Sequence, residues 1–531
     1  MNHSKLKSIG IVSLGTLIGV GLGIISQAII AAYFGAGKAT DSYFMAHSIA
    51  GFFVKMLILG QLSSIFLPIF LEHYTKDKNS AWKLSSNLLN VGIFVSAIVT
   101  IFCLIFSSGI VNFFAPGFEY STKRETILLF KLILPAGLLM ALSTATLANI
   151  LNALKKFILP VIIQLFLKMM TIVLLLIFGN RFGIIILAGI VLVESLIGFM
   201  ILYVTNLKIG LKYYPVLSFT DVSFRKLVKL WFPFIYNNTF ALGAQVVYKI
   251  MVSGLPVGSL SALSYSERIF TVLSQVTNDA VNLVSRQEFA QNTAKKFYSL
   301  LGNALKNSIR ILGLISIPIS IFLIISAQLI VRVLFGRGEF LNQGGVLSTS
   351  MALFFWSILL FPFGCYQLFA STGFALKDTK FIVRLSILTE VIRASLYYIL
   401  PRFFSFSGLI LSGIVAYIIA IIFYQYRLKS YWKIENVKGI YVNLFFLKMF
   451  MIIVLLVIIN LTGKFLLDTI FPQEDLFILA SKLAFLGIVW FGLYFIFSLK
   501  VFRIEEAKLL WDFVKTRGIF SLLKGKFSTG G

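Results

Sequence analysis

Some fourteen long apolar runs, separated by short charged turns, fill this chain of 531 residues. A bilayer-spanning helix needs roughly 20 apolar residues, and so many runs of that length exceed what the core of a water-soluble domain can bury. The mean hydropathy of +0.94 agrees, so we expect an all-α, polytopic membrane protein. The expected spans lie near residues 9–34, 42–70, 86–113, 127–151, 157–178, 183–206, 228–252, 262–286, 304–330, 346–374, 379–400, 408–428, 441–463 and 477–502.

The basic residues indicate how the spans are oriented. Of the 47 Lys and Arg, 23 lie at the N-terminus, in the even-numbered loops and in the tail, whereas the odd-numbered loops hold 8. Positive charge resists translocation, so both termini and the even-numbered loops should be cytoplasmic. We do not expect nucleic-acid binding from the net charge of +27, because no basic stretch forms a separate domain with interleaved aromatic residues.

The cysteines and histidines point to no covalent or metal framework. Cys103 and Cys365 fall inside apolar spans, and the three histidines are scattered along the chain. We therefore expect no disulfide framework, no metal-ligand cluster and no cofactor.

Three local patterns recur at nearly one spacing, as a duplicated unit would leave them. The turn Phe34-Gly35-Ala36-Gly37 matches Leu255-Pro256-Val257-Gly258, residues 115–119 match 335–339, and residues 149–157 match 371–381. Chance recurrence of glycine-containing turns is the alternative. The repeat predicts a six-helix lobe over 1–206, a second over 207–430 in parallel orientation, and two additional helices over 431–502. A basic cytoplasmic tail follows over 503–531, with an interfacial helix as its expected structure.

Ionisable side chains within the spans are the best pointer to function. Each costs about 2.5–3.5 kcal/mol at the bilayer centre, so it should face a cavity or a partner. The mixture of signs leaves cationic groups available for an anionic substrate such as a phosphate. These residues are Lys55, Lys168, Glu194, Lys249, Glu267, Arg268, Asp279, Glu390 and Arg393.

Several of these charges also have a purely structural interpretation. Lys249 is near a span end and could snorkel to the interface, and Lys168 with Glu194 could form a structural ion pair. Glu390 and Arg393 have i,i+3 spacing and could satisfy each other. Lys55 and Arg268 are therefore the stronger candidates. Asp41 could be the N-cap of the second span, with Thr40 as the rival cap.

Seven segments of the chain match, in the same order, segments of a known protein family. They are Ala31-Ala-Tyr-Phe-Gly-Ala-Gly-Lys-Ala-Thr-Asp-Ser-Tyr-Phe44, Gly60-Gln-Leu-Ser-Ser-Ile-Phe-Leu-Pro-Ile-Phe70, Ala115-Pro-Gly-Phe118, Ile150-Leu-Asn-Ala-Leu-Lys-Lys-Phe157, Gly258-Ser-Leu-Ser-Ala-Leu-Ser-Tyr-Ser-Glu-Arg-Ile269, Val333-Leu-Phe-Gly-Arg-Gly-Glu-Phe340 and Phe374-Ala-Leu-Lys-Asp-Thr-Lys380. Together these segments resemble the MurJ/MviN lipid II flippase family. The similarity covers roughly residues 1 to 430 and agrees with fourteen spans.

The resemblance implies a member of the multidrug, oligosaccharidyl-lipid and polysaccharide exporter superfamily in the bacterial inner membrane. It implies two lobes around a central cavity, alternating access, and an undecaprenyl-diphosphate-linked glycan, lipid II, as the substrate flipped to the outer leaflet. The last two helices would help form a groove for the lipid tail. The expected partners are this lipid-linked glycan and membrane lipids, and we expect a monomer.

The family's site residues carry over in part. Arg268 matches a cavity arginine of the family, Glu267 stands where the family has Asp or Asn, and Asp41 matches an acidic residue of its first turn. Two family arginines of the first span align with Val20 and Ser26, so both are absent. In the second span the family's paired arginines become Val54 and Lys55, its glutamate becomes Leu59, and its Pro-Asn step becomes Ala50-Gly51.

Our candidate substrate-binding residues are accordingly Arg268, Lys55, Lys249, Glu267 and Asp41. Glu390 and Asp279 are candidates for binding a coupling Na⁺ or H⁺, with the membrane potential as the other energy source. The alternatives to a lipid II flippase are an exporter of capsule or O-antigen units or of cationic drugs, and a membrane glycosyltransferase. A drug exporter would depend more on carboxylates, and an enzyme would be expected to have a larger external loop.

Overall fold

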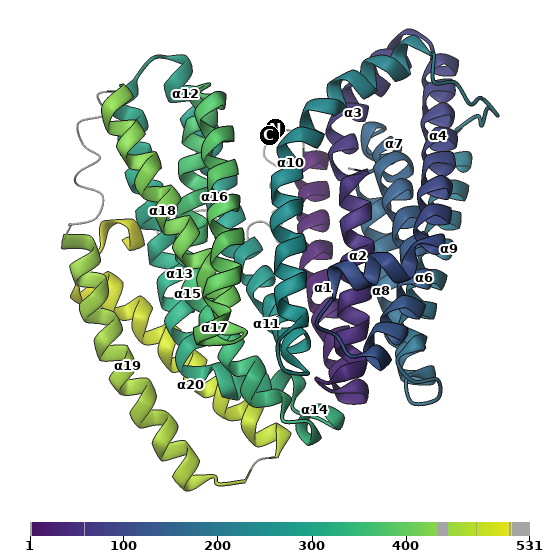
Figure 1. Cartoon of the computed structure of the whole chain (residues 1–531). Coiled ribbons are helices and arrows are strands. Elements are labelled where there is room, and N and C mark those ends of the chain that lie inside the picture. Colours follow the sequence, from purple (N-terminus) through teal and green to yellow (C-terminus); the bar gives the residue numbers. More distant parts are fainter. Residues whose placement is uncertain (1–2, 58, 433–443, 474, 509–510, 512–531) are drawn as a thin grey trace, which may run out of the picture. The chain divides into compact units, whose positions relative to one another are not determined.

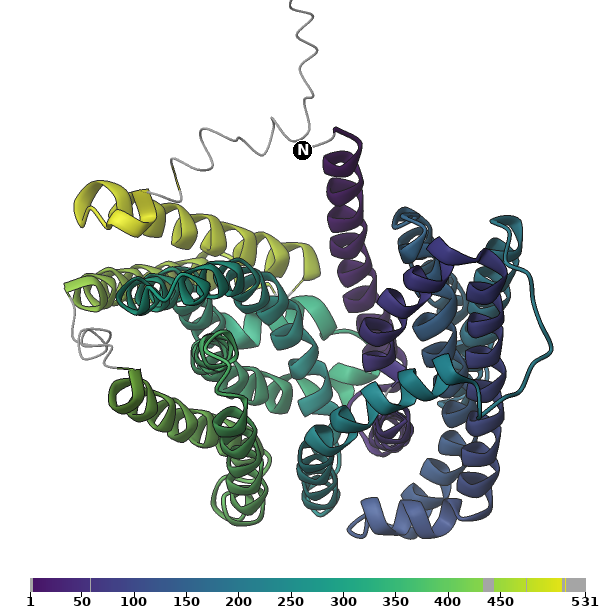
Figure 2. The ribbon, with the colours of Figure 1, turned by 90° about the horizontal axis from the view of Figure 1, so that it is seen from above.

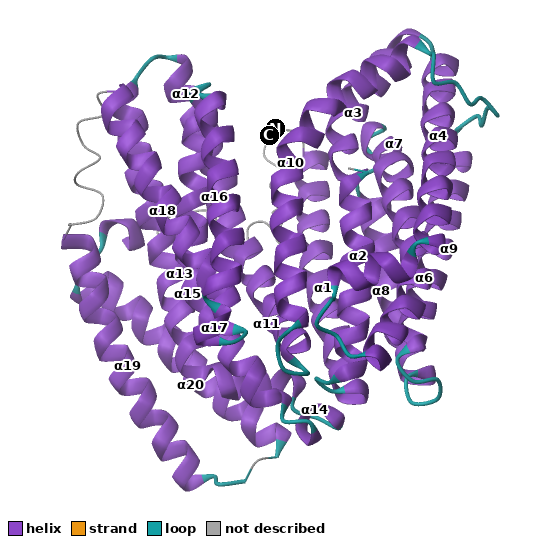
Figure 3. Ribbon diagram, in the orientation of Figure 1, coloured by secondary structure: helices purple, strands orange, loops and turns teal. Residues whose placement is uncertain are grey.

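The computed structural model describes residues 3–57, 59–432, 444–473, 475–508 and 511. Over these residues the chain is helical and contains no strand (Figure 3), which confirms the all-α prediction. It divides into two compact units, residues 1–264 with 337–345 and residues 265–336 with 346–531. The lobe boundaries expected at 206/207 and 430/431 stay predictions.

The first unit is built from antiparallel helices (Figure 1). A π-helical turn over Thr144–Ala148 joins α6 to α7, so these three segments act as one long helix. The helices are α1 (His3–Phe34), α2 (Lys38–Met56), α3 (Leu59–Lys76), α4 (Lys78–Ile105), α5 (Ser107–Phe114), α6 (Tyr120–Ser143), α7 (Asn149–Ala153), α8 (Ile158–Phe178), α9 (Ile185–Lys208), α10 (Val222–Ser253), the start of α11 (Ser259–Ser274) and α14 (Glu339–Asn342).

The second unit begins within α11. A π-helical turn over Gln275–Asp279 continues this helix, and α19 packs along α20 (Figures 1 and 2). Most of the predicted interfacial tail helix lies outside the described residues. The other helices are α12 (Ala280–Ala294), α13 (Tyr298–Phe335), α15 (Gly345–Ala375), α16 (Thr379–Ile399), α17 (Pro401–Phe404), α18 (Ser407–Trp432), α19 (Leu444–Ile470) and α20 (Leu476–Ile496), followed by a π-helical turn over Phe497–Val501.

One predicted span is two helices in the structure. Residues 42–70 were expected as a single span, but α2 ends at Met56 and α3 begins at Leu59. The break places Lys55 in the last turn of α2, where the negative end of the helix dipole stabilises its positive charge. Hydropathy could not show this break, because apolar residues continue on both sides of it.

Close glycine contacts recur at the repeat spacing. A Cβ added to Gly117 would lie 2.6 Å from the Ser253 carbonyl oxygen, and one added to Gly338 would lie 2.3 Å from the Ala32 carbonyl oxygen. Gly117 and Gly338 are 221 positions apart, and so are Ala32 and Ser253. All four belong to the first unit. Gly117 of the first repeat therefore lies against the C-terminal end of α10, the first helix of the second repeat. Gly338 of the second repeat lies against the C-terminal end of α1, the first helix of the first repeat. This reciprocal contact supports an internal duplication.

A second pair of equivalent positions has the same unusual backbone. Lys155 and Lys377, 222 positions apart, have φ values of 61° and 60°. In both places the next residue donates its N–H to a carbonyl five residues back, Lys156 to Leu151 and Asp378 to Gly373. This is the Schellman ending of a helix, with lysine where glycine is usual.

A bend in α13 is braced from α20. Pro318 lacks an N–H, so the Leu314 carbonyl loses its helical partner. The Tyr494 hydroxyl donates to that carbonyl at 2.7 Å, and the Trp490 indole N–H donates to the Pro318 carbonyl at 3.2 Å. Helix α20 thus provides hydrogen-bond donors to backbone carbonyls of α13, which lipid could not do.

Candidate functional site

The candidate binding and coupling residues do not lie on the helices whose composition is most suited to lipid. Among the described residues, ten helices are long and apolar enough to cross a membrane. Four of the fourteen predicted spans are missing from these ten, namely those that contain α2 with α3, α10, α11 with α12, and α16. These four carry every candidate binding or coupling residue that lies within a predicted span. Since lipid contact would be costly for such charges, these helices should face protein or an aqueous cavity.

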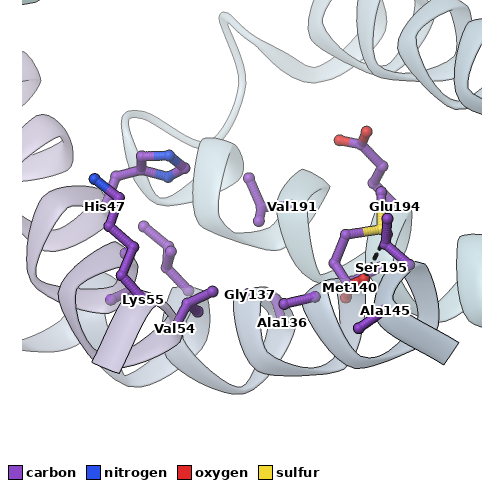
Figure 4. A pocket seen from close by; sticks show the side chains of 15 residues that line it. His47, Val54, Lys55, Ala136, Gly137, Met140, Ala145, Val191, Glu194 and Ser195 are labelled. Carbon is purple, nitrogen blue, oxygen red and sulfur yellow. Dashed lines mark hydrogen bonds between the residues drawn. The ribbon is translucent and has the colours of Figure 1, made fainter. Parts of the chain in front are cut away.

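The first unit contains a pocket of about 530 Å³ between α2, α6 and α9. Small residues make room for it, because glycine and alanine occupy successive turns of α2 and α6. Figure 4 shows His47 and Lys55 on α2 at one side of this pocket and Glu194 with Ser195 on α9 at the other. The lining residues are His47, Ala50, Gly51, Val54, Lys55, Ile133, Ala136, Gly137, Met140, Ala141, Thr144, Ala145, Val191, Glu194 and Ser195.

The basic side of this pocket joins α2 to α10. The Lys55 ammonium lies 3.4 Å from the side-chain oxygen of Gln245, and Lys55 is exposed. Lys249, one turn further along α10, lies over the Tyr248 ring at 5.0 Å. Lys55 and His47 thus both line the pocket, whereas Lys249 lies outside its lining, on α10, one turn beyond the Gln245 partner of Lys55.

The acidic side chain of the pocket has a hydrogen-bond partner on a neighbouring helix. Glu194 accepts a hydrogen bond from the Thr171 hydroxyl of α8 at 3.0 Å. Lys168 donates to the Gly19 carbonyl of α1 at 2.7 Å. Thr171 and Lys168 thus connect α8 to α9 and to α1 respectively, and the ion pair between Lys168 and Glu194 stays a prediction.

Asp41 connects the start of α2 to the start of α11 by hydrogen bonds. It is buried, and its carboxylate accepts hydrogen bonds from the backbone N–H groups of Gly258 at 2.6 Å and Ser261 at 2.8 Å and from the Ser261 hydroxyl at 2.6 Å. The N-cap of α2 is Gly37, so neither Asp41 nor Thr40 takes the capping position expected for them; the Thr40 hydroxyl, three residues into the helix, accepts from the Gly37 N–H at 3.0 Å. Asp41 thus holds α2 against the start of α11, and in this state its oxygens are engaged by protein donors.

The second unit holds the remaining candidates in different environments. Arg268 is half-buried, and its Nε is buried with no hydrogen-bond partner among the described residues. The neighbouring Glu267 is exposed. Asp279 is exposed, and the Gln367 amide donates to it at 3.4 Å.

Glu390 is occupied by its own helix. It pairs with Arg393, which also donates to the Tyr417 hydroxyl at 2.9 Å. This pair matches the i,i+3 alternative considered from the sequence. A carboxylate held in this way has less capacity to bind a coupling ion than Asp279.

Two pocket residues were missed by the sequence reasoning. His47 was set aside as an isolated histidine, and Glu194 was considered but not chosen. The available signal was spacing, because His47, Gly51 and Val54 lie at i, i+4 and i+7 and so share one face of α2.

Comparison with known proteins agrees with this architecture. The family model for lipid II flippase MurJ matches residues 30–480. The chain is 26% identical over 475 residues to a probable lipid II flippase MurJ of Buchnera aphidicola subsp. Acyrthosiphon pisum (strain APS), covering 87% of this chain and 92% of the relative. It is 25% identical over 500 residues to that of Rickettsia prowazekii (strain Madrid E), covering 91% and 96%.

Solved structures share the fold. Lipid II flippase MurJ in an inward closed conformation matches with a TM-score of 0.71 at 23% identity, over 92% of this chain and 98% of that one. An inward-facing multidrug resistance MATE family transporter of the MOP superfamily matches with a TM-score of 0.60 at 12% identity, over 80% and 98%. The described helices thus follow an arrangement already found in membrane transporters.

Proposed function

The chain belongs to the MurJ family of lipid II flippases, and from this premise we propose which of its residues handle the substrate. Its function is that of a lipid II flippase, a transporter in peptidoglycan biosynthesis and not an enzyme. It is a multi-pass membrane protein of a family found in the bacterial inner membrane. Its substrate is a lipid-linked glycan.

We propose that Lys55 and Lys249 bind the diphosphate of this substrate. The observation that carries the proposal is the position of Lys55 and His47 at one side of the 530 Å³ pocket, with Lys55 3.4 Å from Gln245 of α10, the helix that also carries Lys249 one turn further on. That volume lies within the range of small-molecule sites, about 300–1,000 Å³, so the pocket has room for the diphosphate and an adjoining sugar, with the rest of the head group and the lipid tail outside it. Cations are needed there because an unpaired diphosphate would be costly in a low-dielectric interior.

The other candidates have different roles in this proposal. Arg268 stays a predicted substrate contact, since its Nε lacks a described partner and a guanidinium suits phosphate oxygens. Asp41 acts as a positioning residue through its bonds to Gly258 and Ser261. Glu267 is proposed to touch the glycan, for which its exposed carboxylate offers acceptors.

We propose that movement is driven by the membrane potential or by a cation, Na⁺ or H⁺, at Asp279. The potential supplies about 2.3 kcal/mol per charge per 100 mV. Asp279 is the better acceptor, because Glu390 is held by Arg393. Both termini are proposed to be cytoplasmic, on the distribution of basic residues, and the working form is proposed to be a monomer.

The test expresses the parent chain and its variants at matched levels in a bacterium depleted of its lipid II flippase. Rescue of growth and the rate of lipid II flipping are both measured. Lys55→Ala should lower the rate by about tenfold or more, because a charge-assisted hydrogen bond is lost, and Lys55→Arg should restore much of it. Lys156→Ala, at an exposed loop lysine, is the control and should rescue fully.

Each outcome has a distinct meaning. Full activity of Lys55→Ala would remove this residue from the diphosphate site while leaving the flippase function intact. Failure of the well-inserted parent chain would instead favour another lipid-linked oligosaccharide as substrate, consistent with the absence of first-span arginines at Val20 and Ser26.

A further inference from the structure

The segment between α9 and α10 is an extended loop held along α4. Residues 211–219, here called the strap, run at the edge of the first unit (Figures 1 and 2). The strap contains no helix or strand, so its backbone groups need partners from elsewhere.

Side chains of α4 supply those partners. The Asn87 amide donates to the Ser218 carbonyl at 2.8 Å and accepts from the Ser218 N–H at 2.7 Å. The Asn90 amide donates to the carbonyls of Tyr214 at 3.2 Å and Val216 at 2.8 Å. Two asparagines thus replace the neighbouring strand that an extended chain would normally pair with.

The outer side of the strap is apolar. Tyr213, Val216, Leu217 and Phe219 are exposed by 47%, 38%, 51% and 48%. The Phe219 ring lies 6.2 Å from the ring of Phe94 on α4. Beyond Phe94, α4 presents further exposed apolar residues, Ile98 and Ile101, so the apolar surface of the strap continues directly into that of a membrane-spanning helix.

A backbone bonded to protein side chains and an exposed apolar surface together are suited to the membrane interface. In water, an exposed loop can bond its backbone to solvent, and a cluster of exposed apolar side chains would be unfavourable. At the boundary between lipid head groups and acyl chains, less water is present to bond to the backbone. Backbone groups there are stabilised by protein partners, and exposed apolar side chains are stabilised by insertion among the acyl chains. Tyrosine is also typical of this zone, and Lys208 and Lys212 add exposed cations that favour anionic head groups.

We propose that the strap is an interfacial membrane anchor, with the apolar side chains of residues 213–219 inserted at the boundary between lipid head groups and acyl chains. Its partner is the lipid leaflet itself. On the expected orientation this is the cytoplasmic leaflet. The strap thereby fixes the start of α10, the helix that carries Lys249, at a defined depth.

The experiment is a depth measurement in nanodiscs of phosphatidylcholine and phosphatidylglycerol. The full chain carries Cys103→Ala and Cys365→Ala, and a nitroxide label is attached at Leu217→Cys. Collisions with oxygen, which concentrates in lipid, are compared with collisions with a water-soluble nickel complex. The control label is at Lys156→Cys, on an exposed loop outside the strap.

The ratio of oxygen to nickel collisions should be about tenfold higher at position 217 than at position 156, as insertion to acyl depth requires. Adding Asn87→Ala and Asn90→Ala should lower this ratio and raise label mobility. Equal ratios at the two positions would overturn the proposal and indicate an aqueous loop or a surface for another protein. A ratio unchanged by the asparagine substitutions would overturn the role given to α4.

Discussion

At the scale of single residues, Gly51 gives the most selective test of the pocket. It lines the pocket, and a Cβ added there would have no other heavy atom within 4 Å. Gly51→Leu should therefore fold, since leucine also has a higher helix propensity than glycine, by up to about 0.8 kcal/mol. The leucine would fill space that the substrate needs, so flipping should fall by about tenfold or more.

The matched control is Gly21→Leu. Gly21 is also helical and has open space around its added Cβ, but it does not line the pocket. Both variants should keep the thermal stability of the parent chain in detergent. Undiminished flipping by Gly51→Leu would show that the substrate does not enter this pocket.

Single residues also show what the sequence could and could not predict about the site. Lys55 and Lys249 were identifiable because a charge at bilayer depth is costly and therefore conspicuous. The contact of Lys55 with Gln245 was not, because it depends on how α2 and α10 pack. The engaged state of Asp41 was equally hidden, since its donors lie 217 and 220 residues away in the chain.

At the scale of helices and turns, Gly338 tests the contact that recurs in the duplicated turns. Its φ is +52°, and an added Cβ would lie 2.3 Å from the Ala32 carbonyl oxygen. Gly338→Ala should lower the free energy of unfolding by about 2 kcal/mol or more, because backbone strain adds to a clash with backbone that cannot move aside. The measurement is the shift of the unfolding midpoint in detergent.

Gly183→Ala separates the cost of backbone strain from the cost of the steric clash. Gly183 also has a positive φ, +62°, but nothing lies within 4 Å of its added Cβ. It should therefore cost only the strain, about 1 kcal/mol. Equal shifts for the two variants would mean that the close approach of Gly338 to α1 has no energetic weight.

Helices themselves were largely predictable, and their ends were not. Each of the fourteen predicted spans overlaps helix in the structure, because apolar length is a property of the local sequence. The break between α2 and α3 and the π-helical turns beside Thr144 and Asp279 were missed. They interrupt apolar or mixed stretches without changing composition, so a hydropathy pattern contains no trace of them.

At the scale of the whole molecule, the sequence predicted the class, the helical fold and the family, but not the division into compact units. The repeat spacing predicts a boundary between duplicated lobes near residue 206, which stays a prediction, and the compact units are a separate property in which α10 packs within the first unit. Repeat boundaries describe ancestry, and compactness depends on which faces pack together. Neither can be derived from the other.

Orientation is the remaining property of the whole chain, and it follows from charge. Loops with excess Lys and Arg should stay inside, so Tyr120, which is 84% exposed beside an odd-numbered loop, should lie outside and Lys156 inside. In intact cells, with Cys103 and Cys365 replaced by alanine, a membrane-impermeant maleimide should label Tyr120→Cys and should label Lys156→Cys only after permeabilisation. The reverse labelling pattern would show that the protein has the opposite orientation in the membrane. It would also place Lys55 and Lys249 at the opposite end of the transport path, because a helix bundle with fixed connections can only be inverted as a whole.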